Sequence, residues 1–170
     1  MVKKHVKSKQ PNSRMCFVCG LENDFGLKAR FYSVEDKELV GLFNPSDEHQ
    51  GYPGRLHGGI ASTILDETIG RAFLIEHQDS WWVTAELSVR FRKPIPLAET
   101  IKVVGRITGR RGKIFEGTGE ILLPDGTPAA TAKAKYFAQP IDEITGSEEF
   151  ADEMWSTIIE PQDPETLELP

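Results

Sequence analysis

Apolar and polar residues alternate through the second half of the chain, in the pattern of strands that are covered on one face. From Val83 to Phe91 every second residue is apolar, and Pro94 marks the end of this strand. The turn signal at residues 124–127 predicts a hairpin between the last two strands. Further strands are expected over residues 26–33, 37–43, 99–108, 113–123 and 129–138.

One segment between these strands has the period of an amphipathic helix. It runs from about Gly58 to Glu76, and its apolar stripe spans roughly 140° of arc and is expected to face the sheet. Asp66 points to nearly the opposite side, flanked by Ile69 and Phe73. Because an exposed helix face would not normally carry two large apolar residues, we expect a second copy of the protein to cover it. The stripe consists of Ile60, Ala61, Ile64, Leu65, Ala72 and Ile75.

The order of these elements predicts an α+β fold in which an antiparallel sheet wraps around one long central helix. We expect a flexible arm at residues 1–15, a single domain at residues 16–140 and an acidic tail at residues 141–170. Within the tail, Ser147 is a candidate cap for a short, extra C-terminal helix, and residues 161–170 are expected to be loose. The apolar stripe of that helix would be Phe150, Ala151, Met154, Trp155 and Ile158.

Composition and charge narrow the classes of function. The chain has 170 residues, of which 39% are hydrophobic and 27% charged, as is typical of a soluble globular domain. No apolar run has the length of a membrane span, and no apolar segment of a secretory signal follows the basic start, so we expect a cytoplasmic protein without a membrane partner. The whole chain carries −6 and residues 141–170 carry −10, which leaves +4 for residues 1–140. That mild positive charge suits an anionic small molecule and is too weak to indicate nucleic-acid binding.

Cys16 and Cys19 are the two cysteines of the chain and form a single C-x-x-C. One such pair is half of a zinc site, and His5 or His49 would complete it only by an accident of folding. A redox dithiol is disfavoured because no βαβ pattern follows the pair. We therefore expect two reduced, partly packed thiols, no metal and no cofactor.

The stretch from Arg55 to Glu67 holds the candidate chemistry. Gly58 and Gly59 stand at the start of the predicted helix, where unpaired N–H groups and the positive end of the helix dipole suit a developing oxyanion. Asp66 is an acid in an otherwise apolar helix, where burying its carboxyl group costs free energy unless the group has a function. The separation of Gly58 from Asp66 is about 12 Å along a helix, too far for both to act on one carbonyl group. Two antiparallel copies would bring the glycine end of each chain to the acid of the other, so we expect a two-fold dimer with two shared sites.

These residues resemble a known family. His57-Gly58-Gly59 followed at the ninth position by Asp66 is similar to the pattern of the PaaI-like branch of the hotdog-fold acyl-CoA thioesterases. The likeness extends through residues 16–27, 50–54 and 89–96. It implies a hotdog fold, hydrolysis of an acyl-CoA thioester, coenzyme A only as part of the substrate, and a homodimer or a dimer of dimers.

The resemblance also implies roles for individual residues. Asp66 would be the general base or the nucleophile, the Gly58 N–H would polarise the thioester carbonyl, and His57 would shape that end of the site. Thr84 matches a family position whose hydroxyl holds the water. Strict alternation turns Thr84 away from the helix, so this role requires a strand end or a bulge.

Substrate contacts are less closely defined by the resemblance. Some family members have an amide six residues before the histidine; this chain has Gly51 there, and Gln50 is our candidate for that contact. Basic residues near the strand ends are candidates for the phosphates of coenzyme A, and Glu67 is also a candidate partner of Arg71 one turn later. The substrate-binding candidates are Gly59, Glu67, Ile69, Phe73, Trp82, Arg90, Arg92, Lys93, Arg111 and Lys113.

Two other functions stay open. A hotdog dehydratase would pair a histidine with an acid around a 3-hydroxyacyl group, for which His57 and Glu67 are candidates. A hotdog protein can also hold acyl-CoA as a ligand without turning it over. The acid at Asp66 favours thioester hydrolysis over both.

Overall fold

The computed structural model describes residues 1–78, 81–97, 99–140, 143–144 and 156–170. The strands are β1 (Val2–Lys9), β2 (Arg30–Val34), β3 (Leu39–Phe43), β4 (Trp81–Phe91), β5 (Ile101–Arg111), β6 (Ile114–Leu122), β7 (Pro128–Gln139) and β8 (Thr166–Leu169). The helical elements are η1 (Glu35–Lys37), η2 (Asp47–His49) and the long helix α1 (Gly58–Ala72), which continues in the 3₁₀ turn η3 (Phe73–Ile75). The elements expected between residues 26 and 138 are confirmed, with boundaries that differ by a few residues.

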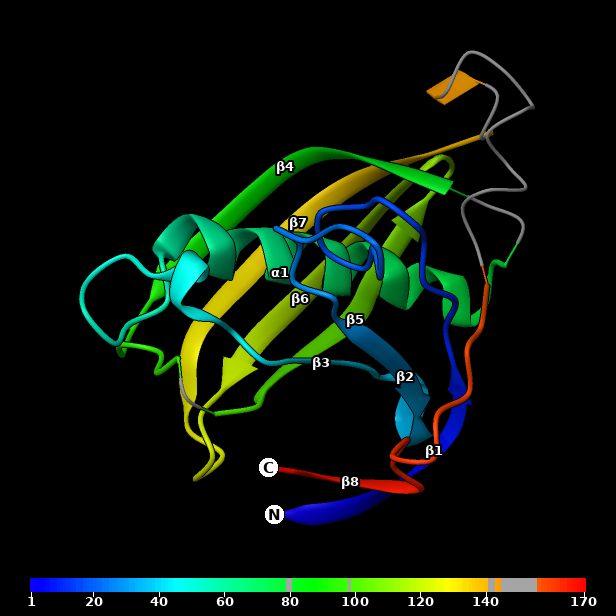
Figure 1. Ribbon diagram of the computed structural model, residues 1–170. Helices are drawn as coiled ribbons and strands as arrows, with labels where there is room; N and C mark the ends of the chain where they lie inside the picture. The colour runs from blue at the N-terminus through cyan, green and yellow to red at the C-terminus, as the bar shows by residue number, and fades with distance from the viewer. Residues whose placement is uncertain (79–80, 98, 141–142, 145–155) are drawn as a thin grey trace.

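The strands form one antiparallel sheet in the order β4-β7-β6-β5-β3-β2-β1-β8. The sheet curls, and α1 lies across its concave side (Figure 1). Strand β4 forms one edge of the sheet and β8 the other. A sheet wrapped around one central helix is the hotdog arrangement that the resemblance implied.

The helix is buried against small residues of the sheet. Ile64, Leu65 and Ile69 are fully buried. The strand β6 approaches closely at Gly117 and Gly119, where an added Cβ would meet side-chain atoms of Ile69 at 2.4 and 2.8 Å. Glycines of the sheet thus make the space that a large aliphatic side chain of the helix fills.

Ile69 and Phe73 do not lie on an exposed helix face, and the expectation that a second copy covers them is wrong. Ile69 is fully buried, and Phe73 stacks on Phe115 of β6 with ring centroids 4.0 Å apart. Because the sheet curls around α1, it covers a wider arc of the helix than the predicted stripe (Figure 1). A dimer must therefore be argued from other surfaces.

The first residues are not the flexible arm that the sequence suggested. Strand β1 pairs with β2 on one side and with β8 on the other, so both termini belong to the sheet (Figure 1). Lys9 Nζ lies 2.8 Å from Asp163 and 3.2 Å from Glu160, and Arg30 forms an ion pair with the same Glu160. The basic start and the acidic tail attract each other across the fold, a pairing that local patterns do not reveal.

The expected C-terminal helix falls largely on residues 145–155, which lie outside the described part of the chain. Where the tail is described again, Ser156 pairs with Asn12 in an antiparallel bridge, and Ile158 is 44% exposed. The segment expected to be loose contains β8. Among the helices of the described residues, none has the length and apolar character of a membrane span.

Candidate functional site

Asp66 lies in the middle of α1, on the side that faces β4 and β7. Thr84 Oγ1 donates to its carboxylate and lies 3.0 and 3.1 Å from the two oxygens. Tyr136 OH lies 3.1 Å from Oδ1 and 2.9 Å from the backbone carbonyl oxygen of Asp66. Thr84 and Tyr136 are register partners on β4 and β7, so two adjacent hydroxyl groups fix one carboxylate.

A β-bulge explains how Thr84 reaches the helix. The register of β4 against β7 shifts between Thr84 and Glu86. Beyond the shift, Leu87 and Val89 pack against the core, while Ser88 lines a groove on the outer face of the sheet. The bulge that the sequence required for this contact is present.

The electrostatic surroundings of Asp66 suit proton transfer. Burial raises the pKa of Asp66, the charge of Glu67 acts in the same direction, and the hydrogen bonds from Thr84 and Tyr136 oppose the shift. Burial also raises the pKa of Tyr136, so its hydroxyl stays a neutral donor. No Lys or Arg of the described residues forms an ion pair with Asp66. A half-buried carboxylate with a raised pKa and no counter-charge can accept a proton.

His57 caps α1 and decides which glycine N–H stays available. Its Nδ1 accepts a hydrogen bond from the Gly59 N–H (2.9 Å), so the neutral ring carries its proton on Nε2. The Gly58 N–H has no hydrogen-bond partner within the described chain. The exposed ring of Phe91 lies beside it, because a Cβ added at Gly58 would be 3.4 Å from Phe91 Cζ. The Gly58 N–H is therefore an open donor at this end of the helix.

The loop before α1 uses the side chain of Gln50 for its own closure. Gln50 Oε1 accepts a hydrogen bond from the Gly54 N–H (2.7 Å), and Gln50 also forms a β-bridge with Leu56. The His57 N–H donates to the carbonyl oxygen of His49 (2.9 Å), which closes the loop onto the helix start. The Nε2 group of Gln50 can still donate to a ligand.

Of the apolar substrate candidates, only Trp82 lies beside the acid. It covers α1 at Gly70, where an added Cβ would be 2.1 Å from Trp82 Nε1. Gly70 follows Asp66 by one helical turn, so Trp82 and the carboxylate share a helix face. Ile69 is buried in the core instead, and Phe73 is buried beside a cavity at the end of α1 that Asp66 does not line.

The basic candidates do not form one cluster. Arg90 and Arg92 line the groove on the face of the sheet opposite to α1. Arg111 and Lys113 flank the β5–β6 turn, at the sheet end where the helix finishes. Lys93 follows β4 at the other end, where the helix starts. A single phosphate site built from all five is thus excluded within one chain.

Glu67 lies on a different side of α1 from Asp66. Its Oε1 accepts a hydrogen bond from Arg71 Nε (2.6 Å), the pairing one turn apart that the sequence suggested. Arg71 is fully buried and also donates from Nη2 to Cys19 Sγ (3.0 Å). The hydrogen bond with Cys16 lowers the pKa of Cys19 to about 6, against the effect of burial and with the help of Arg71. Glu67 therefore packs against the amino-terminal segment and not at the acid's substrate face.

The sequence interpretation missed Tyr136. In β7 the residues that face the helix are Ala130, Ala132, Ala134 and Tyr136, and all four are buried. A tyrosine that ends an inward row of alanines brings one hydroxyl group into an apolar layer, where it needs a partner. That pattern could have drawn attention to the residue.

Comparisons with known proteins concern the sequence and fold of the chain as a whole. Residues 53–130 match the family model of the thioesterase superfamily. The chain is 34% identical over 112 residues to acyl-coenzyme A thioesterase THEM4 of Rattus norvegicus. The aligned region covers 64% of this chain and 47% of that protein. The chain thus spans about half the length of the curated relatives it matches.

Solved structures show the same fold. A thioesterase superfamily protein superposes with a TM-score of 0.68 at 27% identity, covering 73% of this chain and 60% of that one. The E. coli PaaI protein from the phenylacetic acid degradation operon superposes with a TM-score of 0.59 at 15% identity, covering 66% of this chain and 80% of that one. Residues 53–130 are thus similar in sequence to the thioesterase superfamily, and the chain shares the fold of these solved structures.

Proposed function

We propose that this protein is an acyl-CoA thioesterase of the PaaI-like branch, which hydrolyses the thioester to a free acid and coenzyme A. The observation that carries the proposal is the half-buried carboxylate of Asp66, held by Thr84 and Tyr136 without a counter-charge among the described residues. Relatives that are named acyl-coenzyme A thioesterases support the substrate class. Coenzyme A enters only as part of the substrate.

Two routes use the same groups. In the first, Asp66 takes a proton from water while the water oxygen attacks the carbonyl carbon, and the intermediate then expels the coenzyme A thiolate, which takes up that proton. In the second, Asp66 itself attacks, releases the thiolate and forms a mixed anhydride that water hydrolyses. Both routes develop negative charge on the carbonyl oxygen. The Gly58 N–H, at the positive end of α1, is the proposed donor to that oxygen.

Each site is shared by two chains in this proposal. Gly58 and Asp66 are about 12 Å apart along the helix, so one chain cannot offer both to one carbonyl group. The edge strand β4 has 11 residues and carries the exposed apolar side chains Val83, near its start, and Phe91, at its end. A long unpaired edge of this kind can form hydrogen bonds with a strand of a second chain. Pairing of β4 with its copy around a two-fold axis would bring each glycine end toward the other acid.

Lys93 is the basic residue that we retain for a coenzyme A phosphate, because it lies at the Gly58 end of the sheet. The variant Lys93→Ala should raise KM for an acyl-CoA and leave KM unchanged for a short acyl thioester that lacks the nucleotide. An equal change with both substrates would contradict a phosphate contact.

Release of coenzyme A from a panel of short, medium and aromatic acyl-CoA esters tests the activity, with chromatography as the readout because the protein has thiols of its own. We expect turnover by the wild type and none above background by Asp66→Asn. A parallel incubation with a 3-hydroxyacyl-CoA identifies a dehydratase by its enoyl product. Tight binding of acyl-CoA without release would instead identify a ligand-binding protein.

Mixing two inactive variants tests the shared site. Gly58→Pro removes the N–H at the first helical position, which tolerates proline, and His57 already has the extended backbone that a following proline requires. Gly58→Ala keeps the N–H and is the matched control. Co-expression of Gly58→Pro with Asp66→Asn should restore about a quarter of the wild-type activity, since half of the statistical dimers contain one intact site. No recovery, or a monomer in sedimentation, would rule out sharing.

A further inference from the structure

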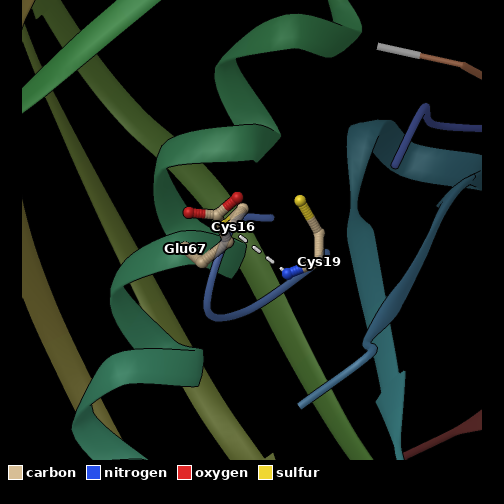
Figure 2. A group of neighbouring side chains, drawn as sticks. All are labelled: Cys16, Cys19 and Glu67. Atoms are coloured by element: carbon tan, nitrogen blue, oxygen red, sulfur yellow. Dashed lines mark hydrogen bonds between the residues drawn. The ribbon is translucent and has the colours of Figure 1, made fainter. Parts of the chain in front are cut away.

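Three metal-ligating side chains from two distant segments meet beside the central helix (Figure 2). Cys16 and Cys19 lie in the turn that precedes β2, and Glu67 projects from α1. The two sulfur atoms and a carboxylate oxygen all lie within 4.8 Å of one another. We propose that Cys16, Cys19 and Glu67 bind a Zn²⁺ ion. The sequence alone offers only the cysteine pair, and the fold supplies the third donor.

Both sulfur atoms are in contact with hydrogen-bonding groups of the surrounding chain. Cys16 Sγ accepts from the backbone N–H groups of Val18 (3.3 Å) and Cys19 (3.5 Å), so the turn folds its own amides onto the sulfur. Cys19 Sγ accepts from Arg71 (3.0 Å) and lies 3.4 Å from Ser13 Oγ. These contacts position both sulfur atoms beside the Glu67 carboxylate.

Arg71 provides the charge balance for a buried divalent ion. In the filled site, two thiolates and the Glu67 carboxylate carry three negative charges. Arg71 and a divalent cation carry three positive charges, so the net charge is zero. Arg71 occupies Oε1 of Glu67 and leaves Oε2 for the metal. It would then act as the outer partner that orients Glu67 and Cys19, as is common around bound metals.

The donor set selects zinc over harder cations. Two thiolates disfavour Mg²⁺ and Ca²⁺, which take oxygen ligands. Tetrahedral zinc with Zn–S bonds of about 2.3 Å would hold the two sulfur atoms about 3.8 Å apart. In the present cluster the two sulfur atoms lie within 4.8 Å of each other. Cys16 is half-buried, which leaves a fourth position for water on the solvent side. The bound ion would tie the amino-terminal turn to α1.

Cobalt titration of the full-length, tag-free, reduced protein tests the site, because thiolate ligands give Co²⁺ a charge-transfer absorption in the near ultraviolet. We expect one Co²⁺ per chain, an absorption of the strength of two thiolates, and its loss when Zn²⁺ is added. Cys16→Ser and Cys19→Ser should each remove the two-thiolate absorption. Zn²⁺ should raise the Tm of the wild type and not of Cys16→Ser.

The neighbouring acids provide a matched pair of variants. Glu67→Gln should weaken Co²⁺ binding at least tenfold, whereas Asp66→Asn should leave it unchanged. Absence of the charge-transfer absorption at stoichiometric Co²⁺ would overturn the proposal, and so would Glu67→Gln binding like the wild type. Conversion of the two thiols to a disulfide without Co²⁺ binding would show a redox pair instead. Circular dichroism checks each fold, and Cys16→Ser at its half-buried position carries the test if Glu67→Gln does not fold.

Discussion

Asp66 and Glu67 are neighbours in α1 and carry the same chemical group, yet the fold gives them opposite surroundings. Asp66 faces β4 and β7, where Thr84 and Tyr136 offer hydroxyl groups and the described residues offer no counter-charge. Glu67 lies about 100° further around the helix, against the amino-terminal turn. There it pairs with the fully buried Arg71 at 2.6 Å.

The difference shows how one helix can separate a reactive acid from a neutralised one. Hydroxyl donors fix the position of Asp66 without cancelling its charge, so it keeps the ability to take a proton. Arg71 cancels the charge of Glu67 and is itself costly to bury without that partner. Catalysis should therefore depend on Asp66, and stability on the Glu67–Arg71 pair.

The largest effect is expected on turnover. Replacing Asp66 by Asn should lower kcat for acyl-CoA hydrolysis by about 10²–10⁴-fold, because the amide cannot take a proton from water. The free energy of unfolding should stay the same or rise, since the amide avoids the burial of an uncompensated charge. Steady-state kinetics and urea denaturation measure the two quantities.

The neighbouring acid serves as the control for that variant. Folded Glu67→Gln should keep kcat within a few-fold of the wild type, as the amide retains the position of the side chain away from the catalytic face. A loss of turnover in Glu67→Gln comparable to that in Asp66→Asn would erase the distinction between the two acids.

Stability should respond in the opposite way. Arg71→Met removes the guanidinium and leaves the Glu67 carboxylate without its partner, which should lower the free energy of unfolding by about 3–5 kcal/mol. The side chain of Arg71 is 0% exposed and that of Glu67 is 20% exposed, so solvent screens the ion pair little. Urea denaturation at a fixed protein concentration measures the effect. A loss well below 1 kcal/mol would mean that water, not Arg71, compensates Glu67.

The sequence predicted much of this fold because the patterns that determine it are local. Alternation from Val83 to Phe91 and the helical period from Gly58 depend on near neighbours, and both elements are present. Thr84 shows the limit of such patterns. Strict alternation turned it away from the helix, and only a bulge in the pairing with β7 turns it back.

What the sequence could not show are contacts between distant segments. Lys9 meets Asp163 only after the sheet has closed, so the first strand looked like a loose arm. Phe73 belongs to the core because the sheet curls far enough around α1 for Phe115 to stack on it. In the same way, Arg71 joins Cys19 only because the amino-terminal turn folds onto the helix. None of these contacts produces a periodic pattern in the sequence.

A smaller effect should separate the two hydroxyl groups at Asp66 from the acid itself. Thr84→Val and Tyr136→Phe each keep the shape and remove one hydrogen bond, and each should lower kcat by roughly 5- to 30-fold, equivalent to about 1–2 kcal/mol. KM should change little, because these groups hold the acid and not the acyl chain. Serine at position 84 keeps a hydroxyl group and should restore part of the loss. If both variants retained full kcat, the hydroxyl groups would be packing partners only.

The smallest effect concerns the pH dependence of stability. Burial raises the pKa of Asp66 in the folded state, so the folded protein holds this proton more tightly than the unfolded chain does. Below the pKa of the unfolded chain, Asp66 is protonated in both states and adds no penalty. As the pH rises through the folded-state pKa, ionisation of the half-buried carboxylate costs the wild type stability that Asp66→Asn does not lose.

The stability gained by Asp66→Asn over the wild type should therefore be least in acid and should rise to a plateau toward neutral pH. Urea denaturation of both chelator-treated proteins between about pH 4 and about pH 8 covers the range in which a raised aspartate titrates. The same series on Arg71→Met provides a control without the Asp66 change and should lack this rise. A flat or falling difference for Asp66→Asn would mean that the hydrogen bonds from Thr84 and Tyr136 outweigh burial. The hydroxyl groups would then compensate the charge of Asp66 as well as the Arg71 guanidinium compensates that of Glu67.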